Sequence, residues 1–223
     1  MSKKSYFLLE FDKQQNQIKT FDYSTTDKFK DDKVFVDNDD VLFIIDGVIL
    51  NKKELLSKAG TSDWTSFMLN EYSKDKEKFF HQMRGSFWGI AINKKSGELL
   101  AYADHVGSKQ LFYSDNQDAL IISTNCYNLT KHLRANTPVS PSINEQAAYF
   151  VLNYGYTIED MTIVSEINRL IPGFYLTKLE KDVSAKQFFV LSKKPKAISD
   201  DDAIEEIDRL FRKAVRNQYE KDK

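Results

Sequence analysis

Apolar residues recur in short runs along most of the chain, and residues that favour turns separate the runs. The clearest case is residues 87–92, which are rich in aromatic and β-branched side chains. Turn-forming residues 93–97 follow, and residues 98–103 form a second apolar run. Two such runs joined by a short turn that contains glycine predict a β-hairpin.

A polar segment, residues 104–109, interrupts the apolar pattern directly after this hairpin, and a strand pattern resumes at residue 110. The segment is either a turn or the edge of a binding site. Asp104 and His105 could form an acid–base pair, but no serine in a nucleophile-elbow context accompanies them. We therefore favour a loop turn for these two residues.

The same reasoning predicts further strands and helices along the chain. Strands are expected at residues 5–11, 34–36, 41–45, 119–123 and 173–176, with a returning strand that finishes at 187–191, and residues 12–32 are expected to form a hairpin with a loose edge. Helices are expected at residues 52–58, from 62 onwards, around 79–83, at 126–133 and at 146–154. Asn51 and Glu54 have the spacing of a capping box for the first helix. Strands and helices that occur in blocks predict an α+β fold with antiparallel sheets.

The composition changes after residue 191. Residues 192–199 read as a linker, and residues 200–223 as an amphipathic helix that follows a domain spanning residues 1–191. The apolar face of this helix comprises Ala203, Ile204, Ile207, Leu210, Phe211, Ala214 and Val215. Either this face docks back on the domain, or the helix begins a second, synthetase-type domain.

Composition excludes several classes of function. The 223 residues are 41% hydrophobic, enough for a packed core, and the net charge is only -1. No basic segment interleaved with aromatic residues suggests nucleic-acid binding, and no apolar run approaches the roughly 20 residues that span a membrane. A single cysteine, Cys126, excludes an internal disulfide and fits a reducing compartment, so we expect a cytoplasmic protein. His81, His105 and His132 lack metal-site spacing and are expected to be structural or exposed.

Five segments, taken in order, resemble a known family. They are residues 45–51 (IDGVILN), 60–63 (GTSD), 84–87 (RGSF), 104–107 (DHVG) with 111–113, and 171–176 (IPGFYL). Together they resemble the amidotransferase half of asparagine synthetases, a type 2 glutamine amidotransferase domain, over roughly residues 5–190. The resemblance implies an N-terminal-nucleophile hydrolase fold, a four-layer αββα sandwich of two antiparallel sheets. The terminal helix is similar to the start of the family's ATP-using domain.

The catalytic residue of that family is missing from this sequence. Glutamine hydrolysis there requires a cysteine as the mature first residue, since its thiolate attacks the amide and its free amine is the base. The resemblance aligns Ser5 with that cysteine, but Ser5 has a peptide nitrogen instead of an amine. Removal of Met1 would make Ser2 the first residue, and Ser2 is the alternative nucleophile.

Other positions of the family's site also differ here. Asp46 and Gly47 replace the Asn-Gly pair that stabilises the oxyanion, and an ionised carboxylate would repel that charge. Asp63 matches the acid that holds the substrate's amino group, although a helix N-cap explains Asp63 equally well. The arginine that binds the glutamine carboxylate has no counterpart between residues 12 and 40. Asp104, in the polar segment at residues 104–109, completes the expected degenerate pocket.

These differences predict a catalytically degenerate amidotransferase-like domain that docks on an ATP-dependent synthetase domain, in the same chain or another. Such a parent protein would join a carboxylate to an amine. This chain itself would need no cofactor, and ATP and Mg²⁺ would bind only the partner domain. A homodimer is also possible. The alternatives are a working amide hydrolase that uses Ser2, and a binding module in which Asp46 and Asp63 favour an amine ligand.

Overall fold

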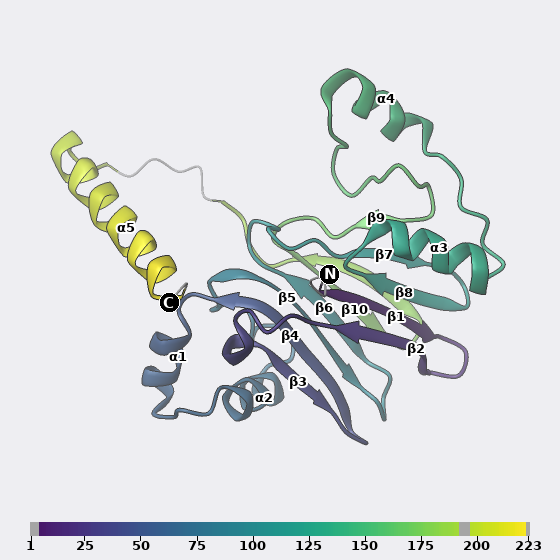
Figure 1. Ribbon diagram of the computed structural model, residues 1–223, viewed down its shortest axis with the longest axis horizontal. Coiled ribbons are helices and arrows are strands. Elements are labelled where there is room, and N and C mark those ends of the chain that lie inside the picture. Colours follow the sequence, from purple (N-terminus) through teal and green to yellow (C-terminus); the bar gives the residue numbers. More distant parts are fainter. Residues whose placement is uncertain (1–4, 192–196, 222–223) are drawn as a thin grey trace.

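The computed structural model describes residues 5–191 and 197–221, and its centre is formed by two antiparallel sheets that lie face to face (Figure 1). Sheet A has the order β2 (Gln17–Ser24), β1 (Tyr6–Asp12), β8 (Ala119–Ser123), β7 (Phe112–Asp115) and β9 (Asn168–Arg169). Sheet B has the order β11 (Asp182–Gln187), β10 (Phe174–Leu179), β6 (Leu99–Ala103), β5 (Gly85–Asn93), β4 (Val41–Ile49) and β3 (Val34–Asp37). The helices are α1 (Lys52–Ala59), α2 (Trp64–Lys74), α3 (Cys126–Asn136), α4 (Glu145–Tyr154) and α5 (Asp200–Lys221), with a short 3₁₀ turn, η1 (Lys30–Asp32).

Strand alternation produces the layers of this fold. In β4, Phe43 and Ile45 belong to the apolar cluster shared with α1 and α2, whereas Leu42 and Ile44 belong to the cluster between the two sheets. Successive strand residues point to opposite faces, so one apolar strand can fill two cores.

The same alternation in β8 completes the stack of layers. Leu120 faces sheet B, whereas Ile121 packs with Leu129 and Leu133 of α3. Helices thus cover the outer face of each sheet, and the α+β, four-layer αββα prediction is confirmed.

Most of the predicted elements are present, including the hairpin of β5 and β6 and the pairing of β2 with β1. The helix predicted around residues 79–83 is wrong, because residues 76–82 form turns. Phe79, Phe80 and Met83 are nevertheless buried in the cluster beneath α2. Apolar spacing alone cannot distinguish a compact turn from one helical turn. The strand predicted at 187–191 also ends earlier, at Gln187.

The capping box at the start of α1 does not form, although Asn51 is the N-cap residue. The Asn51 side chain instead accepts a hydrogen bond from Arg84 N (2.8 Å) and donates one to Gln82 O (2.9 Å). The amide therefore joins the start of α1 to the segment that leads into β5.

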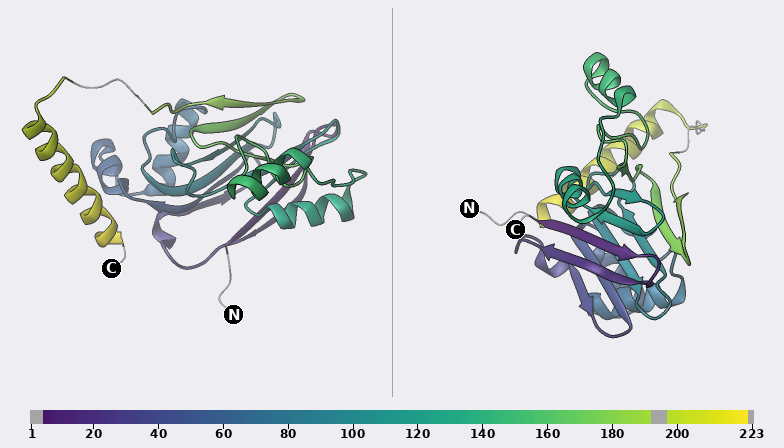
Figure 2. Two further views of the ribbon diagram at one scale, coloured as in Figure 1. Left: turned by 90° about the horizontal axis from the view of Figure 1, so that it is seen from above. Right: turned by 90° about the vertical axis from the view of Figure 1, so that its right-hand side faces the viewer.

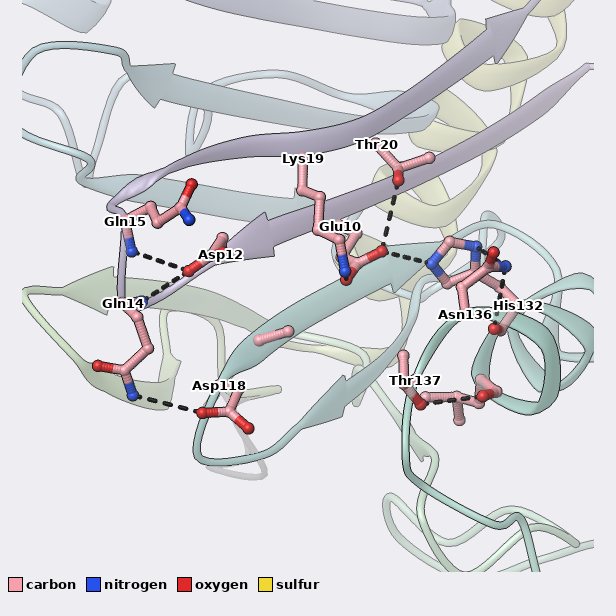
Figure 3. A network of polar contacts seen from close by, with 12 residues as sticks. Glu10, Asp12, Gln14, Gln15, Lys19, Thr20, Asp118, His132, Asn136 and Thr137 are labelled. Carbon is pink, nitrogen blue, oxygen red and sulfur yellow. Dashed lines mark hydrogen bonds and ion pairs between the residues drawn. The ribbon is translucent and has the colours of Figure 1, made fainter.

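A buried carboxylate joins α3 to sheet A (Figure 3). Glu10 of β1 is 2% exposed, and its oxygens lie 2.7 Å from Lys19 Nζ of β2 and 2.7 Å from His132 Nε2 of α3. Asn136 Nδ2 lies 3.2 Å from the other ring nitrogen of His132. Burial by itself would raise the pKa of Glu10, but the hydrogen bonds and charges of Lys19 and His132 lower that pKa below its ordinary value of 4.5.

This lowered pKa predicts that stability depends on pH. A carboxyl group with a lower pKa in the folded state stabilises the protein above its unfolded pKa, and that contribution is lost as the pH falls through the folded pKa. We expect the free energy of unfolding, measured by urea titration, to fall more steeply below pH 4.5 in the wild type than in Glu10→Gln. Equal slopes in the two proteins would contradict this role of Glu10.

Helix α5 lies at one end of the molecule, separate from the sandwich (Figure 2). None of its residues is buried, and Ile207 and Phe211 are each 67% exposed. Contacts with the domain occur at its C-terminal turn, where Lys221 Nζ lies 2.6 Å from Asp32 Oδ1. The apolar face of α5 therefore does not dock on the sandwich in this structure. Residues 192–196 of the predicted linker lie outside the described residues.

Candidate functional site

Four segments that are far apart in the sequence meet at one end of the sandwich. Ser86 Oγ at the start of β5 lies 2.8 Å from Ser108 Oγ in the corner loop between β6 and β7. Gly107 in the same loop abuts Pro172, because a Cβ at Gly107 would lie 2.7 Å from Pro172 Cγ. Gly47 of β4 pairs with Phe87 of β5. Most of the segments that carried the family resemblance are therefore neighbours in space.

Asp46 is a buried carboxylate in β4 and is 3% exposed. Its Oδ2 accepts hydrogen bonds from Ser5 Oγ (3.2 Å), Tyr23 OH (3.0 Å) and Thr25 Oγ1 (2.6 Å). Lys33 Nζ lies 3.8 Å from Asp46 Oδ1 and donates to Thr25 Oγ1 at 2.6 Å. We call these five residues the Asp46 cluster.

The charge of the Asp46 cluster explains its hydrogen-bond directions. Burial, together with the charge of Asp46, raises the pKa of Tyr23 above its ordinary value of 10.0. The phenol therefore keeps its proton and donates it to the carboxylate. An ionised carboxylate can only accept hydrogen bonds, so Asp46 cannot act as a donor to an oxyanion.

Asp104 organises the corner loop from inside and is 1% exposed. Its oxygens accept hydrogen bonds from the backbone N–H groups of Phe87 (3.3 Å), Val106 (3.2 Å), Ser108 (3.0 Å) and Lys109 (3.1 Å). The Ser108 hydroxyl lies a further 2.7 Å from Oδ2. A carboxylate that accepts several backbone N–H bonds holds a loop in one conformation, so the loop-turn prediction for Asp104 is confirmed.

Two hollows lie on either side of Ser108. One, of about 380 Å³, is lined by Ser5, Tyr6, Trp88, Ser108, Lys109, Gln110, Thr124, Asn125 and Asn128. The other, of about 430 Å³, is lined by Lys28, Phe29, Val48, Leu50, Gly85, Ser86, Ser108, Gln218 and Lys221. Ser5 thus lines the first hollow, whereas Asp46 and Asp104 are enclosed in their own hydrogen-bonded clusters.

Asp63 is the N-cap residue of α2 and directly precedes the first helical residue, Trp64. Its side chain accepts hydrogen bonds from Ser66 N (3.1 Å) and from Ser66 Oγ (2.6 Å). These bonds lower the pKa of Asp63 below its ordinary value of 3.8. The N-cap interpretation of Asp63 is therefore confirmed, and its role in a ligand pocket stays a prediction. Ser2 lies outside the described residues.

Two of the three histidines lie close together although they are 24 residues apart in the chain. The rings of His81 and His105 pack against Phe188, with centroids 5.0 and 5.1 Å away. Burial and the neighbouring Arg84 charge lower the pKa of His105, which favours a neutral ring at pH 7. Within residues 5–191 and 197–221, no three His, Cys, Asp or Glu side chains gather as they would around a metal ion.

The sequence interpretation missed Tyr23, Thr25 and Lys33 as partners of Asp46. They lie in a polar stretch without clear periodicity. Lys33 directly precedes β3, which begins beside Ile45 of β4, and Tyr23 and Thr25 lie at the end of β2 in the other sheet. The sequence offered one signal, an apolar strand pattern at residues 41–45 that is followed directly by Asp46. A carboxylate that is buried in this way requires hydrogen-bond donors nearby. That signal predicts that partners exist without identifying them.

Comparison with known proteins identifies the family. The family model described as a glutamine amidotransferase domain matches residues 32–189. The chain therefore belongs to the glutamine amidotransferase domain family, in agreement with the resemblance seen in the sequence. A search of curated proteins found no match.

Two solved structures show a distant likeness. The glutamine phosphoribosylpyrophosphate amidotransferase from B. subtilis complexed with ADP and GMP is 12% identical, with a TM-score of 0.45. A structure described as the allosteric regulatory enzyme of purine biosynthesis is 11% identical, with the same TM-score of 0.45. Each match covers 85% of this chain and 44% of the other, so this chain spans less than half the length of those proteins. Along the described part of the chain, no helix has the length and apolar character needed to cross a membrane.

Proposed function

We propose that this glutamine amidotransferase domain is catalytically degenerate and serves as the docking half of an asparagine-synthetase-like, ATP-dependent amide-forming protein in the cytoplasm. The observation that carries the proposal is the hydrogen bonding of the Asp46 carboxylate. Its carboxylate accepts three hydroxyl hydrogen bonds, at a position where the family needs a donor.

Hydrolysis of an amide passes through a tetrahedral intermediate with a negative oxygen. Preorganised donors that face this oxygen contribute a large part of the rate, and removal of one donor costs about 10²–10³-fold in kcat. A buried carboxylate at the donor position opposes the same charge. Asp46 therefore argues against efficient hydrolysis even if a nucleophile were supplied.

Ser5, the candidate nucleophile within the described residues, already uses its hydroxyl in a hydrogen bond. The Ser5 hydroxyl lies 3.2 Å from Asp46 Oδ2 and donates to it, and the Ser5 nitrogen belongs to the peptide bond with Lys4. An N-terminal nucleophile needs its free amine as the base. Ser5 therefore has the geometry of a structural residue.

The direct test is an assay of ammonia release by the purified 223-residue chain incubated with glutamine. We expect no release above the buffer blank, with a competent amidotransferase as the positive control. Turnover that disappears in Ser2→Ala would contradict the proposal and support hydrolysis by Ser2. A second assay on Asp46→Asn, which restores the family's amide, is also expected to show no turnover because a nucleophile is still missing.

An exposed apolar surface on α4 supports the docking role. Helix α4 projects from the sandwich (Figure 1), and Tyr149, Leu152 and Tyr154 are 58%, 86% and 59% exposed. Tyr156, just after the helix, is 64% exposed. Large apolar side chains exposed on one projecting helix are typical of an interaction site. The proposed occupant is the ATP-dependent domain, in the same chain or another, which would bind ATP and Mg²⁺.

Docking is tested with the ATP-dependent domain of an asparagine synthetase expressed without its own amidotransferase half. Mixed with this chain, it is expected to co-elute in size-exclusion chromatography. Leu152→Asp should abolish co-elution, whereas Asn153→Asp, on the neighbouring residue, should preserve it. Failure to co-elute, or co-elution unaffected by Leu152→Asp, would contradict α4 as the docking surface.

A further inference from the structure

Helix α5 presents an apolar face that the sandwich leaves uncovered. The face, called the α5 stripe, consists of Ala203, Ile204, Ile207, Leu210, Phe211, Ala214 and Val215. Ile204, Leu210 and Val215 are 65%, 49% and 49% exposed. The spacing of three and four residues places the stripe on one side of a 22-residue helix. A helix with such a face gains stability by packing it against another apolar surface.

The charges of α5 are divided between its two halves. The first half carries Asp200, Asp201, Asp202, Glu205, Glu206 and Asp208, and the second half carries Arg209, Arg212, Lys213, Arg216 and Lys221 together with a single acid, Glu220. Two pairs bridge the halves within the helix, Glu206 with Arg209 (2.6 Å) and Asp208 with Arg212 (2.7 Å). An acidic start and a basic end agree with the helix dipole. They also make the helix complementary to a second copy of itself in reverse direction.

We propose that α5 pairs with α5 of a second copy of this chain in an antiparallel, two-fold symmetric dimer. In this direction the acidic half of each helix lies along the basic half of the other, whereas a parallel pair would oppose like charges. Two-fold symmetry also requires a self-complementary surface, and the α5 stripe meets that requirement.

The spacing of the stripe fits an antiparallel overlap centred on Arg209. Ile207 then lies beside Phe211 of the second copy, and Ile204 lies beside Ala214 of the second copy. Two large side chains therefore meet near the centre of the overlap, and a large side chain meets a small one towards its ends. The same overlap places Glu206 of one helix near the level of Lys213 of the other, and both positions flank the stripe beside Leu210.

The attachment of α5 to its own domain leaves the stripe available. Lys221 contacts Asp32, and Glu220 Oε2 lies 3.5 Å from Lys53 Nζ, both at the last turn of the helix. Figure 2 shows the helix at the edge of the molecule, beyond the outer strands and helices of the sandwich. A second copy can therefore approach the stripe without displacing any contact within the domain.

The test measures the mass of the intact chain by sedimentation equilibrium at micromolar concentration. We expect twice the chain mass of 25.9 kDa. Ile207→Asp and Phe211→Asp should each raise the dimer dissociation constant by at least about tenfold, since both side chains lie at the centre of the pairing. Arg209→Gln, on the opposite face, should leave the constant within about twofold. Far-UV circular dichroism confirms that each variant keeps its folded domain.

Charge exchange tests the direction of the pairing. Glu206→Lys and Lys213→Glu, on the flank of the stripe beside Leu210, should each weaken the homodimer, and mixing the two variants should restore dimer as a heterodimer. Raising the salt concentration should weaken the wild-type dimer because exposed charges are screened.

A monomer at all concentrations, or a dimer unaffected by Ile207→Asp and Phe211→Asp, would overturn the inference. A monomer would leave the stripe to another occupant, such as a following domain. The inference does not rest on the proposed function, because neither result changes the expected outcome of the glutamine assay.

Discussion

Replacing Gly47 by alanine is expected to destabilise the protein by about 4 kcal/mol or more, enough to unfold much of the population of a marginally stable domain. A Cβ at Gly47 would lie 2.2 Å from Ser86 O and 2.6 Å from Phe87 Cα. Both atoms belong to the backbone of β5, the strand paired with β4 at this point. The clash cannot be relieved by rotating a side chain, so β4 and β5 would have to separate locally.

The backbone conformation adds to this cost. Gly47 has a φ of +142°, a region that residues with a side chain rarely adopt. Gly60→Ala is the matched control, because Gly60 also has a positive φ, +66°, but a Cβ there would meet nothing within 4 Å. It should cost only about 1–2 kcal/mol.

Urea unfolding followed by circular dichroism measures both variants. A Gly47→Ala protein as stable as Gly60→Ala would contradict the close approach of β4 and β5. The result also bears on the site, because Gly47 directly follows Asp46 in β4.

Asp46→Ala is expected to cost about 3–5 kcal/mol, the range found when one partner of a buried ion pair is removed. The substitution would leave Lys33, whose side chain is 10% exposed, without its carboxylate. The hydroxyls of Tyr23 and Thr25 would lose their shared acceptor as well. Each buried donor left unsatisfied costs about 1–3 kcal/mol.

Asp63→Ala serves as the control for this prediction. Asp63 is exposed and caps α2, so its loss should cost about 1 kcal/mol. Asp46→Asn should fall between the two, since the amide keeps one acceptor oxygen but loses the charge that faces Lys33. If Asp46→Ala were no more destabilising than Asp63→Ala, the Asp46 cluster would not be a structural feature of the fold.

The two variants together separate structure from chemistry. A large loss of stability in Asp46→Ala, with no glutamine hydrolysis in Asp46→Asn, is the outcome expected if the former oxyanion position now stabilises the sandwich. Hydrolysis that appears in Asp46→Asn would instead show that a nucleophile is present and that Asp46 alone suppresses it.

Local features of the fold could be predicted because neighbouring residues encode them. The hairpin of β5 and β6 follows from two apolar runs joined by a turn that contains Gly97, and Asp63 is recognisable as the N-cap of α2. The helix expected around residues 79–83 was wrong because three buried apolar residues in a turn have the same spacing as one face of a helix. The spacing of apolar residues therefore predicts which residues are buried more reliably than it predicts their secondary structure.

The candidate site was less predictable because its partners come from distant parts of the chain. The sequence predicts that Asp46 matches the family's oxyanion position, but Tyr23 and Thr25 approach it across 23 and 21 residues of sequence. Glu10 and His132 are separated by 122 residues and form a buried pair with no local signal. Which donors satisfy a buried charge depends on the path of the chain.

The sequence by itself therefore determined most of the strands, most of the helices and the glutamine amidotransferase domain family, while the loss of catalysis that it predicts from Ser5 and Asp46 stays a prediction. Short-range periodicity and residue identity suffice for these features. Only the tertiary structure decided which hydrogen-bond donors and cations surround the buried carboxylates of Asp46 and Glu10. It also decided whether the apolar face of α5 is covered. Burial of a charge and exposure of an apolar face both depend on which distant segments approach, and long-range packing alone brings those segments together.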